Sequence, residues 1–176
     1  GSSDALVIEA DESDGTLPKY RPQLGVFLNM SKDHKELSEL YRLFSDFRAN
    51  SRDFLVNADA ANLAGLQAGA RSFGFSAGTL RGEDLRTDGF SSRFRVGSVN
   101  FTLPWPGRHN AENALAAAAA AEAFGVALES SAEALAGYRG VARRFESIGT
   151  AAGVEVIADF AHNPDKVRAA LGAAHL

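Results

Sequence analysis

The amino-acid sequence predicts an α/β fold built on an open, mostly parallel sheet with flanking helices and a small antiparallel β section. Short continuous apolar runs, which are typical of buried parallel strands, alternate with segments of helical periodicity in the first half of the chain. Further along, apolar residues fall in short stretches broken by glycine, as expected of hairpins. With 176 residues, of which 45% are hydrophobic, the chain can bury a sizeable core.

Four apolar runs predict the strands of the first half. We expect them at Ala5–Ile8, Leu24–Leu28, Phe54–Val56 and Ser72–Phe75. Asp33 opens a predicted helix between the second and third runs, because the apolar residues that follow it fall at helical spacing. These residues are Leu37, Leu40, Leu43, Phe44 and Phe47. A short helix rich in alanine and leucine separates the last two runs.

The rhythm changes after residue 90, where hairpin strands are predicted on either side of Gly97 and Ser98. An alanine-rich stretch that stops at Gly125 is typical of a long helix with a glycine at its end. A domain boundary is expected close to Gly140. The remaining predicted elements are helices over Asn110–Phe124 and Ser130–Tyr138, a hairpin of Arg144–Ile148 and Val154–Ile157, and a helix from Asn163.

The composition excludes several classes of protein. The absence of cysteine rules out a disulfide scaffold, a thiolate zinc site and a cysteine nucleophile. A net charge of −4 and a pI near 5.6 argue against an electrostatic binder of nucleic acid or of an anionic membrane. The longest apolar-looking stretch, Ala114–Ala121, is far shorter than the roughly 20 residues that a membrane span needs.

Polar residues follow the first two predicted strands, at the edge where open α/β sheets place their ligands. The acidic run Glu9–Gly15 fits either a solvated turn or a divalent-cation site, and its spacing fails the EF-hand pattern. His34 follows the next strand, so parallel pairing would bring it to the same edge as Glu9. Asp33 reads equally well as a helix N-cap, and His34 as a polar residue of the first helical turn.

Three later motifs carry groups that suit a nucleotide. Asn110 and Asn113 stand at a helix start with i, i+3 spacing, and their amides can donate to and accept from adenine, although capping is the simpler interpretation. Arg144 can reach phosphate oxygens in forked geometry, or pair with Glu146 on the surface. Asp159 ends a predicted strand and can accept hydrogen bonds from ribose hydroxyls.

Taken in order, five motifs resemble the Mur ligase family, the ATP-dependent ligases of bacterial cell-wall synthesis. They are Glu-Ala-Asp-Glu-Ser-Asp-Gly (9–15), Leu-Asn-Met-Ser-Lys-Asp-His (28–34), Gly-Arg-His-Asn-Ala-Glu-Asn-Ala-Leu-Ala (107–116), Arg-Arg-Phe-Glu (143–146) and Asp-Phe-Ala-His-Asn-Pro (159–164). The resemblance covers Asp4 to Leu176. It implies that residues 1–140 are the second part of the family's central ATPase domain and that residues 141–176 begin its C-terminal, Rossmann-like domain.

The resemblance also implies the chemistry. The family uses ATP and Mg²⁺ to activate a carboxylate as an acyl phosphate, which an amine then converts into an amide. The acidic run is most similar to the branch that joins L-alanine, or a recycled tripeptide, to UDP-N-acetylmuramate in the bacterial cytoplasm. The implied site residues are Glu9 and His34 for the metal, Asn110 and Asn113 for adenine, Arg144 as the catalytic residue at the γ-phosphate, and Asp159 for the ribose.

The sequence departs from the family at several positions. The family's phosphate loop, Gly-Lys-Thr, is absent from these residues, so we expect the chain to be a piece of a larger ligase and to be inactive without the rest of its parent chain. Ala158 stands where this branch carries an aspartate, and Lys-Glu-Leu follows His34 in place of Met-Asp. A related amide ligase of the cyanophycin or folylpolyglutamate type, or a non-catalytic nucleotide-binding scaffold, remains an alternative.

Overall fold

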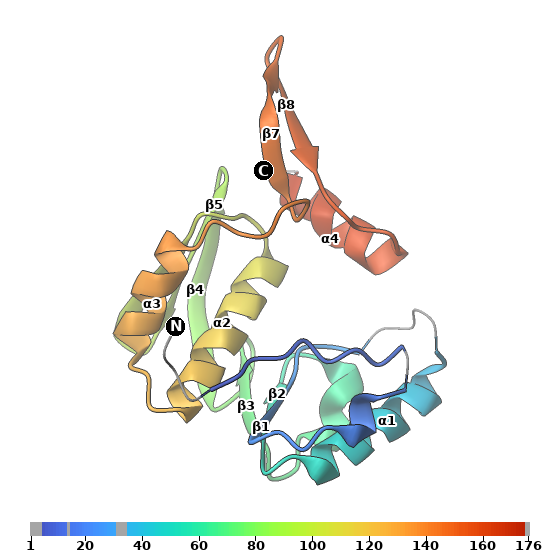
Figure 1. Ribbon diagram of the computed structural model, residues 1–176. Helices are drawn as coiled ribbons and strands as arrows, with labels where there is room; N and C mark the ends of the chain where they lie inside the picture. The colour runs from blue at the N-terminus through green and yellow to red at the C-terminus, as the bar shows by residue number, and fades with distance from the viewer. Residues whose placement is uncertain (1–4, 14, 31–34, 175–176) are drawn as a thin grey trace.

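The structure is a computed structural model that describes residues 5–13, 15–30 and 35–174 (Figure 1). Its strands are β1 (Leu24–Phe27), β2 (Asp53–Asn57), β3 (Arg71–Gly74), β4 (Leu80–Asp88), β5 (Ser91–Val96), β6 (Val99–Leu103), β7 (Glu146–Ala151) and β8 (Val154–Ala158). Its α-helices are α1 (Leu37–Asn50), α2 (Arg108–Ala123), α3 (Leu128–Gly137) and α4 (Pro164–Ala174), and two 3-10 helices are η1 (Leu17–Lys19) and η2 (Ala61–Leu66).

Six strands form one sheet in the order β1-β2-β3-β4-β5-β6. Neighbouring strands from β1 to β4 run parallel, whereas β4, β5 and β6 pair antiparallel. Strands β7 and β8 form a separate antiparallel hairpin. The predicted α/β fold, with a mostly parallel sheet, flanking helices and a small antiparallel section, is therefore confirmed.

Strand β2 shows how the sheet separates two hydrophobic clusters. Phe54, Leu55 and Val56 are all buried, and successive side chains of a strand point to opposite faces. Phe54 and Val56 pack with α1 and η2 on one face, while Leu55 packs on the other face with α2 and the antiparallel strands. Strand β2, the neighbour of the edge strand β1, is thus covered on both faces, which explains its uninterrupted apolar sequence.

The two helical layers use different side chains. Helix α1 contributes aromatic residues, and the ring of Phe44 stacks on Phe27 of β1 with 4.2 Å between centroids. Helix α2 contributes mainly alanine, and Ala111, Leu115 and Ala118 are fully buried against the sheet. Small side chains let this helix approach several strands at once. The predicted alanine-rich helix is confirmed with bounds that differ by at most two residues.

The predicted strand at Ala5–Ile8 is wrong. These residues form no strand, and the exposed fractions of Leu6, Val7 and Ile8 are 84%, 93% and 54%. An apolar run becomes a strand only where a neighbour supplies hydrogen-bond partners and cover. Within the part of the chain that the structure describes, β1 pairs with β2 alone, and its other edge is not joined to residues 5–8.

Strand β4 is missing from the predicted elements, and Phe90, expected in a hairpin strand, lies in the turn that follows β4. The sequence of β4 is rich in charge, and the pairing register shifts between Glu83 and Arg86, where Asp84 adopts a φ of 55°. Such a bulge breaks the alternation by which an amphipathic strand is recognised. The helix expected from Asp33 begins at Leu37, while Asp33 lies outside the described residues.

The C-terminal region, residues 141–174, extends away from the sheet (Figure 1). All residues of β7 are exposed, whereas Phe145 and Ala173 are buried. The ring of Phe145 lies 6.4 Å from that of Phe90, and a side chain at Gly107 would lie 3.1 Å from the Cβ of Ala173. These contacts connect the region to the sheet and to the start of α2. None of the described helices is long and apolar enough to cross a membrane.

Candidate functional site

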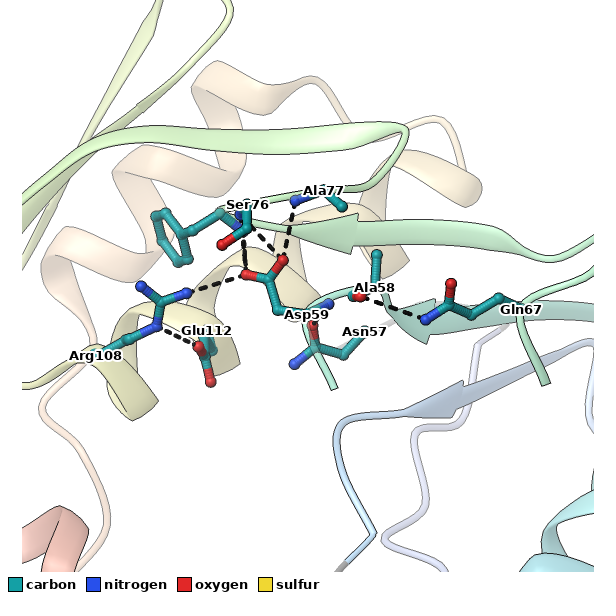
Figure 2. Close-up of polar contacts among 9 residues, drawn as sticks. Asn57, Ala58, Asp59, Gln67, Ser76, Ala77, Arg108 and Glu112 are labelled. Atoms are coloured by element: carbon teal, nitrogen blue, oxygen red, sulfur yellow. Dashed lines mark hydrogen bonds and ion pairs between the residues drawn. The ribbon is translucent and has the colours of Figure 1, made fainter. Parts of the chain in front are cut away.

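The carboxyl ends of β2 and β3 meet the first turn of α2 at one edge of the sheet. Asp59 follows β2, Phe75 and Ser76 follow β3, and Arg108 is the first residue of α2. Figure 2 shows the polar groups of Asp59, Ser76 and Arg108 pointing toward one another. Ligands of open α/β sheets bind at the carboxyl ends of the strands, so this convergence marks the candidate site.

The carboxylate of Asp59 is the polar centre of this edge. Its side chain is only 9% exposed, and its Oδ2 accepts a hydrogen bond of 2.7 Å from the backbone N–H of Phe75. The N–H of Ser76 lies 3.0 Å from both carboxylate oxygens, and the N–H of Ala77 donates to Oδ1 at 3.0 Å. Successive backbone donors therefore surround one anion.

Arg108 joins this carboxylate to α2. Its Nη2 lies 3.1 Å from Oδ2 of Asp59, and its Nε donates to Oε1 of Glu112 at 2.8 Å, one helical turn further on. Its guanidinium also lies over the ring of Phe75, 5.5 Å from the centroid. Two carboxylates and an aromatic ring therefore contact one planar guanidinium, and these contacts favour a single orientation of it.

Burial raises the pKa of Asp59, but the N–H groups of Ser76, Phe75 and Ala77 and the charge of Arg108 lower it, and the pKa falls below its ordinary value of 3.8. Asp59 is therefore ionised at neutral pH. Its negative charge binds the backbone N–H groups of residues 75–77, in the loop after β3, and the guanidinium of Arg108 at the start of α2.

Asn110 and Asn113 lie on α2 close to Arg108. Asn110 is half-buried, and its Nδ2 donates to the carbonyl of Pro106 at 2.7 Å. Asn113 is exposed about one turn further along the helix. The structure thus places both predicted adenine contacts at the start of α2, with the first amide in a local helix-start bond and the second facing solvent.

His109 lies where α2 meets the C-terminal region. Burial lowers the pKa of His109 below 6.5, although the negative charges of Asp159 and Glu112 oppose that shift. The imidazole is therefore neutral at pH 7, with one donor and one acceptor nitrogen. The predicted ribose residue, Asp159, is one of the two carboxylates whose charge acts on this ring.

Asp159 and Arg144 both make contacts inside the C-terminal region. Asp159 accepts hydrogen bonds from the N–H of Phe145 at 2.8 Å and the N–H of Ala161 at 2.7 Å. The guanidinium carbons of Arg143 and Arg144 lie 5.1 and 5.6 Å from the centroid of the Phe160 ring. The two predicted nucleotide residues are therefore held close together by the turn that leads into β7.

The predicted metal ligands are described only in part. Glu9 is exposed, and its carboxylate suits a hard cation that keeps several waters. His34 lies outside the described residues, so its distance from Glu9 is not defined. Among the residues that the structure describes, no group of three or more His, Cys, Asp or Glu side chains could hold a metal ion.

The sequence analysis misses Asp59 as a site residue. Asp59 lies three residues after the predicted strand Phe54–Val56, and a carboxylate just after a parallel strand is the same signal that singles out Glu9. Arg108 stands inside the quoted Gly-Arg-His-Asn motif without an assigned role. Both could be found by asking which charged residues follow every predicted parallel strand.

Comparison with known proteins gives a consistent result. A family model described as the Mur ligase middle domain matches residues 1–121. The UDP-N-acetylmuramate–L-alanine ligase of Thermobifida fusca is 36% identical over 192 residues, which cover 99% of this chain and 41% of that protein. The corresponding ligase of Paenarthrobacter aurescens is 40% identical over 195 residues, covering 99% of this chain and 42% of that protein.

Solved structures agree with this similarity. The UDP-N-acetylmuramate–alanine ligase MurC of Thermotoga maritima superimposes with a TM-score of 0.81 at 29% identity, over 93% of this chain and 40% of that one. A murein peptide ligase, Mpl, of Psychrobacter arcticus gives a TM-score of 0.63 at 25% identity, over 90% of this chain and 36% of that one. The chain therefore spans about two-fifths of the length of these relatives.

Proposed function

The chain belongs to the Mur ligase family, and we propose that the protein carrying it is an ATP-dependent ligase of peptidoglycan synthesis or recycling. The observation that supports this most directly is the start of α2, where Asn110 and Asn113 lie on the first turns of one helix and a Cβ at Gly107 would lie 3.1 Å from the Cβ of Ala173 in the C-terminal region. The start of α2 and the C-terminal region are therefore in contact. Amides, a neutral imidazole and a carboxylate are groups that recognise a base and a ribose.

We propose a role for each of these residues. Asn113 and Asn110 bind the edge of adenine, and Asp159 accepts from the ribose hydroxyls. Arg144, whose guanidinium carbon lies 5.6 Å from the centroid of the Phe160 ring, neutralises charge on the γ-phosphate during transfer. No nucleophile from the protein is needed, because the substrate carboxylate attacks the γ-phosphorus and releases ADP. The amine then attacks the carbonyl carbon of the acyl phosphate, loses a proton and displaces phosphate.

Mg²⁺ would be held by Glu9 and His34, and it would neutralise charge on the phosphates. The central ATPase function is assigned to residues 1–140 and the start of the C-terminal domain to residues 141–176. We expect that residues 1–176 alone would not form amides, because the family's Gly-Lys-Thr phosphate loop is not among them. The relatives' names support UDP-N-acetylmuramate and L-alanine as substrates. A ligase of these substrates would act in the bacterial cytoplasm.

Amide formation by the full-length protein tests this function. The protein is supplied with ATP, Mg²⁺ and UDP-N-acetylmuramate, and L-alanine and the tripeptide are offered separately while phosphate release and product mass are measured. We expect a product with L-alanine. A product with the tripeptide alone would move the protein to the recycling branch, and no product with either acceptor, despite ATP binding, would favour a nucleotide-binding scaffold.

Matched variants connect the activity to the site. Asn113→Ala is expected to raise the KM for ATP about tenfold while the KM for UDP-N-acetylmuramate stays unchanged. Asn100→Ala, which removes an exposed asparagine of β6, serves as the control and leaves both values unchanged. Arg144→Ala is expected to lower kcat by about 100-fold. Equal KM values for ATP in the Asn113 and Asn100 variants would contradict the assignment of the base site.

A further inference from the structure

The connection between β3 and β4 is unusually short for parallel strands. β3 ends at Gly74 and β4 begins at Leu80, yet Phe73 pairs with Leu80 and Gly74 with Arg81 in parallel register. Parallel neighbours are ordinarily joined by a crossover of about a dozen residues or more. Residues 75–78 must therefore leave the sheet and return within a tight loop, where backbone N–H groups lose sheet partners, whereas the N–H of Thr79 already donates to the carbonyl of Ser72 in β3.

Asp59 supplies the partners that this loop lacks. Its carboxylate accepts the N–H groups of Phe75, Ser76 and Ala77, as described above. The loop is wrapped closely around it, because a Cβ at Gly74 would lie 2.8 Å from Oδ1 of Asp59 and 2.5 Å from the carbonyl of Ala77. Gly78 completes the turn with a φ of +121°, which a residue with a side chain rarely adopts.

The same carboxylate also reaches α2. Arg108 donates a hydrogen bond to Oδ2 of Asp59 and lies over the ring of Phe75. Its guanidinium donates a second hydrogen bond to Glu112 (Figure 2). Asn110 lies two positions after Arg108, and Asn113 lies five positions after it. Both amides therefore lie on the first two turns of the helix that begins at Arg108. The end of β2, the loop and the helix start are thus joined through one side chain.

We propose that Asp59 is a positioning residue for the nucleotide base: with Arg108 it clamps the 75–77 loop to the first turn of α2, and so fixes Asn110 and Asn113 where they meet adenine. This inference rests on the proposed function. Asp59 itself touches no base in this role, because its oxygens are occupied by the loop and by Arg108.

The test uses two ligands of the full-length protein, ATP and inorganic tripolyphosphate, which lacks the base. Asp59→Asn keeps the shape of the side chain but removes its charge and one acceptor oxygen. Affinity for ATP is expected to fall about fivefold to tenfold, while affinity for tripolyphosphate changes less than about twofold. Arg108→Gln is expected to give the same selective loss.

Asp53→Asn is the matched control, because Asp53 forms an exposed pair with Arg71 at 3.9 Å on the opposite end of β2. It should change neither affinity. Wild-type affinity for ATP in a folded Asp59→Asn variant would overturn the proposal, and so would an equal loss for both ligands.

Hydrogen exchange separates the clamp from the proposed function. In the 176-residue chain without ligand, Arg108→Gln is expected to speed exchange of the Phe75, Ser76 and Ala77 amides about threefold or more, because the carboxylate that holds them loses its partner. Unchanged exchange would show that the helix and the loop are not coupled, and would overturn the proposal. A wild-type protein that binds tripolyphosphate but not ATP would contradict the proposed function, because the base would not be recognised. Faster exchange in Arg108→Gln would then show that the clamp stabilises the fold alone.

Discussion

The sheet region, residues 24–137, and the C-terminal region, residues 141–174, differ in where their apolar side chains lie. In the sheet region, Val56, Phe73 and Leu115 are fully buried between the sheet and its helices. In the C-terminal region, Ile148, Val154 and Leu171 remain more than half exposed. The sheet region is therefore stabilised by its own core, whereas the C-terminal region depends on a few contacts with the sheet region.

The largest expected effect tests that difference directly. Phe73→Ala in β3 removes a fully buried ring and is expected to cost about 3–5 kcal/mol of unfolding free energy. Val156→Ala in β8, where the side chain is 42% exposed, is expected to cost less than about 1 kcal/mol. Urea unfolding monitored by circular dichroism measures both. Similar losses in the two variants would show that the hairpin belongs to the same cooperative core.

Asp59 gives the next largest effect, within the sheet region. At pH 7, Asp59→Asn is expected to cost about 1–3 kcal/mol, because donors near the carboxylate lose a charged partner. The pKa of Asp59 is lower in the folded state than in the unfolded state, so the stabilisation is complete above about pH 4 and disappears as the pH falls through the lowered pKa.

Unfolding of wild type and variant at pH 7 and again in strong acid checks this sign. The difference between them should shrink in acid. Asp53→Asn, on the same strand but in an exposed pair, should change stability by less than about 0.5 kcal/mol at either pH. A difference between wild type and Asp59→Asn that is independent of pH would mean that the charge of Asp59 does not stabilise the loop.

A third variant tests the link between the two regions. Phe145→Ala removes the buried ring that packs near Phe90 and is expected to release β7 and β8. Amides of the hairpin should exchange faster, while the sheet region keeps its protection. Ile148→Ala, which changes a side chain that is 63% exposed, is the control. Unchanged hairpin exchange in Phe145→Ala would show that other contacts hold the C-terminal region.

The smallest expected effect is the pH response of His109, where the regions meet. Its folded pKa is lower than 6.5, so the unfolded state binds more protons below that pH, and stability falls as the pH drops from about 6.5 to the lowered pKa. His109→Gln should flatten this slope in thermal unfolding between pH 7 and pH 5. If the stability of the variant depends on pH as steeply as that of the wild type, the proton is taken up by another group.

The two regions also differ in how well the sequence predicts them. Strands such as Phe54–Val56 are predicted because burial on both faces makes their sequence apolar. Strand β4 is missed because its bulge and its charged residues hide the alternation, and Ala5–Ile8 is mistaken for a strand because an apolar run cannot reveal whether it has a neighbour. Pairing is a long-range property, and a local pattern does not contain it.

The same limit applies to the candidate site. The motif around Asn110 and Asn113 is found from its spacing, because both amides lie on one helix. The clamp of Asp59 on the 75–77 loop and Arg108 joins residues up to 49 positions apart, and no local pattern connects them. Asp159 is predicted as a nucleotide residue, and its bonds to Phe145 and Ala161 emerge only from the folded turn.

The central claim, that the start of α2 is the base-binding edge of a Mur ligase, is tested most directly by a crystal structure. The full-length protein would be crystallised with Mg²⁺ and a non-hydrolysable ATP analogue. We predict that the adenine edge lies within hydrogen-bonding distance, about 3 Å, of the Asn113 amide, with the ribose hydroxyls at Asp159. An adenine bound elsewhere, with Asn113 still facing solvent, would contradict the claim.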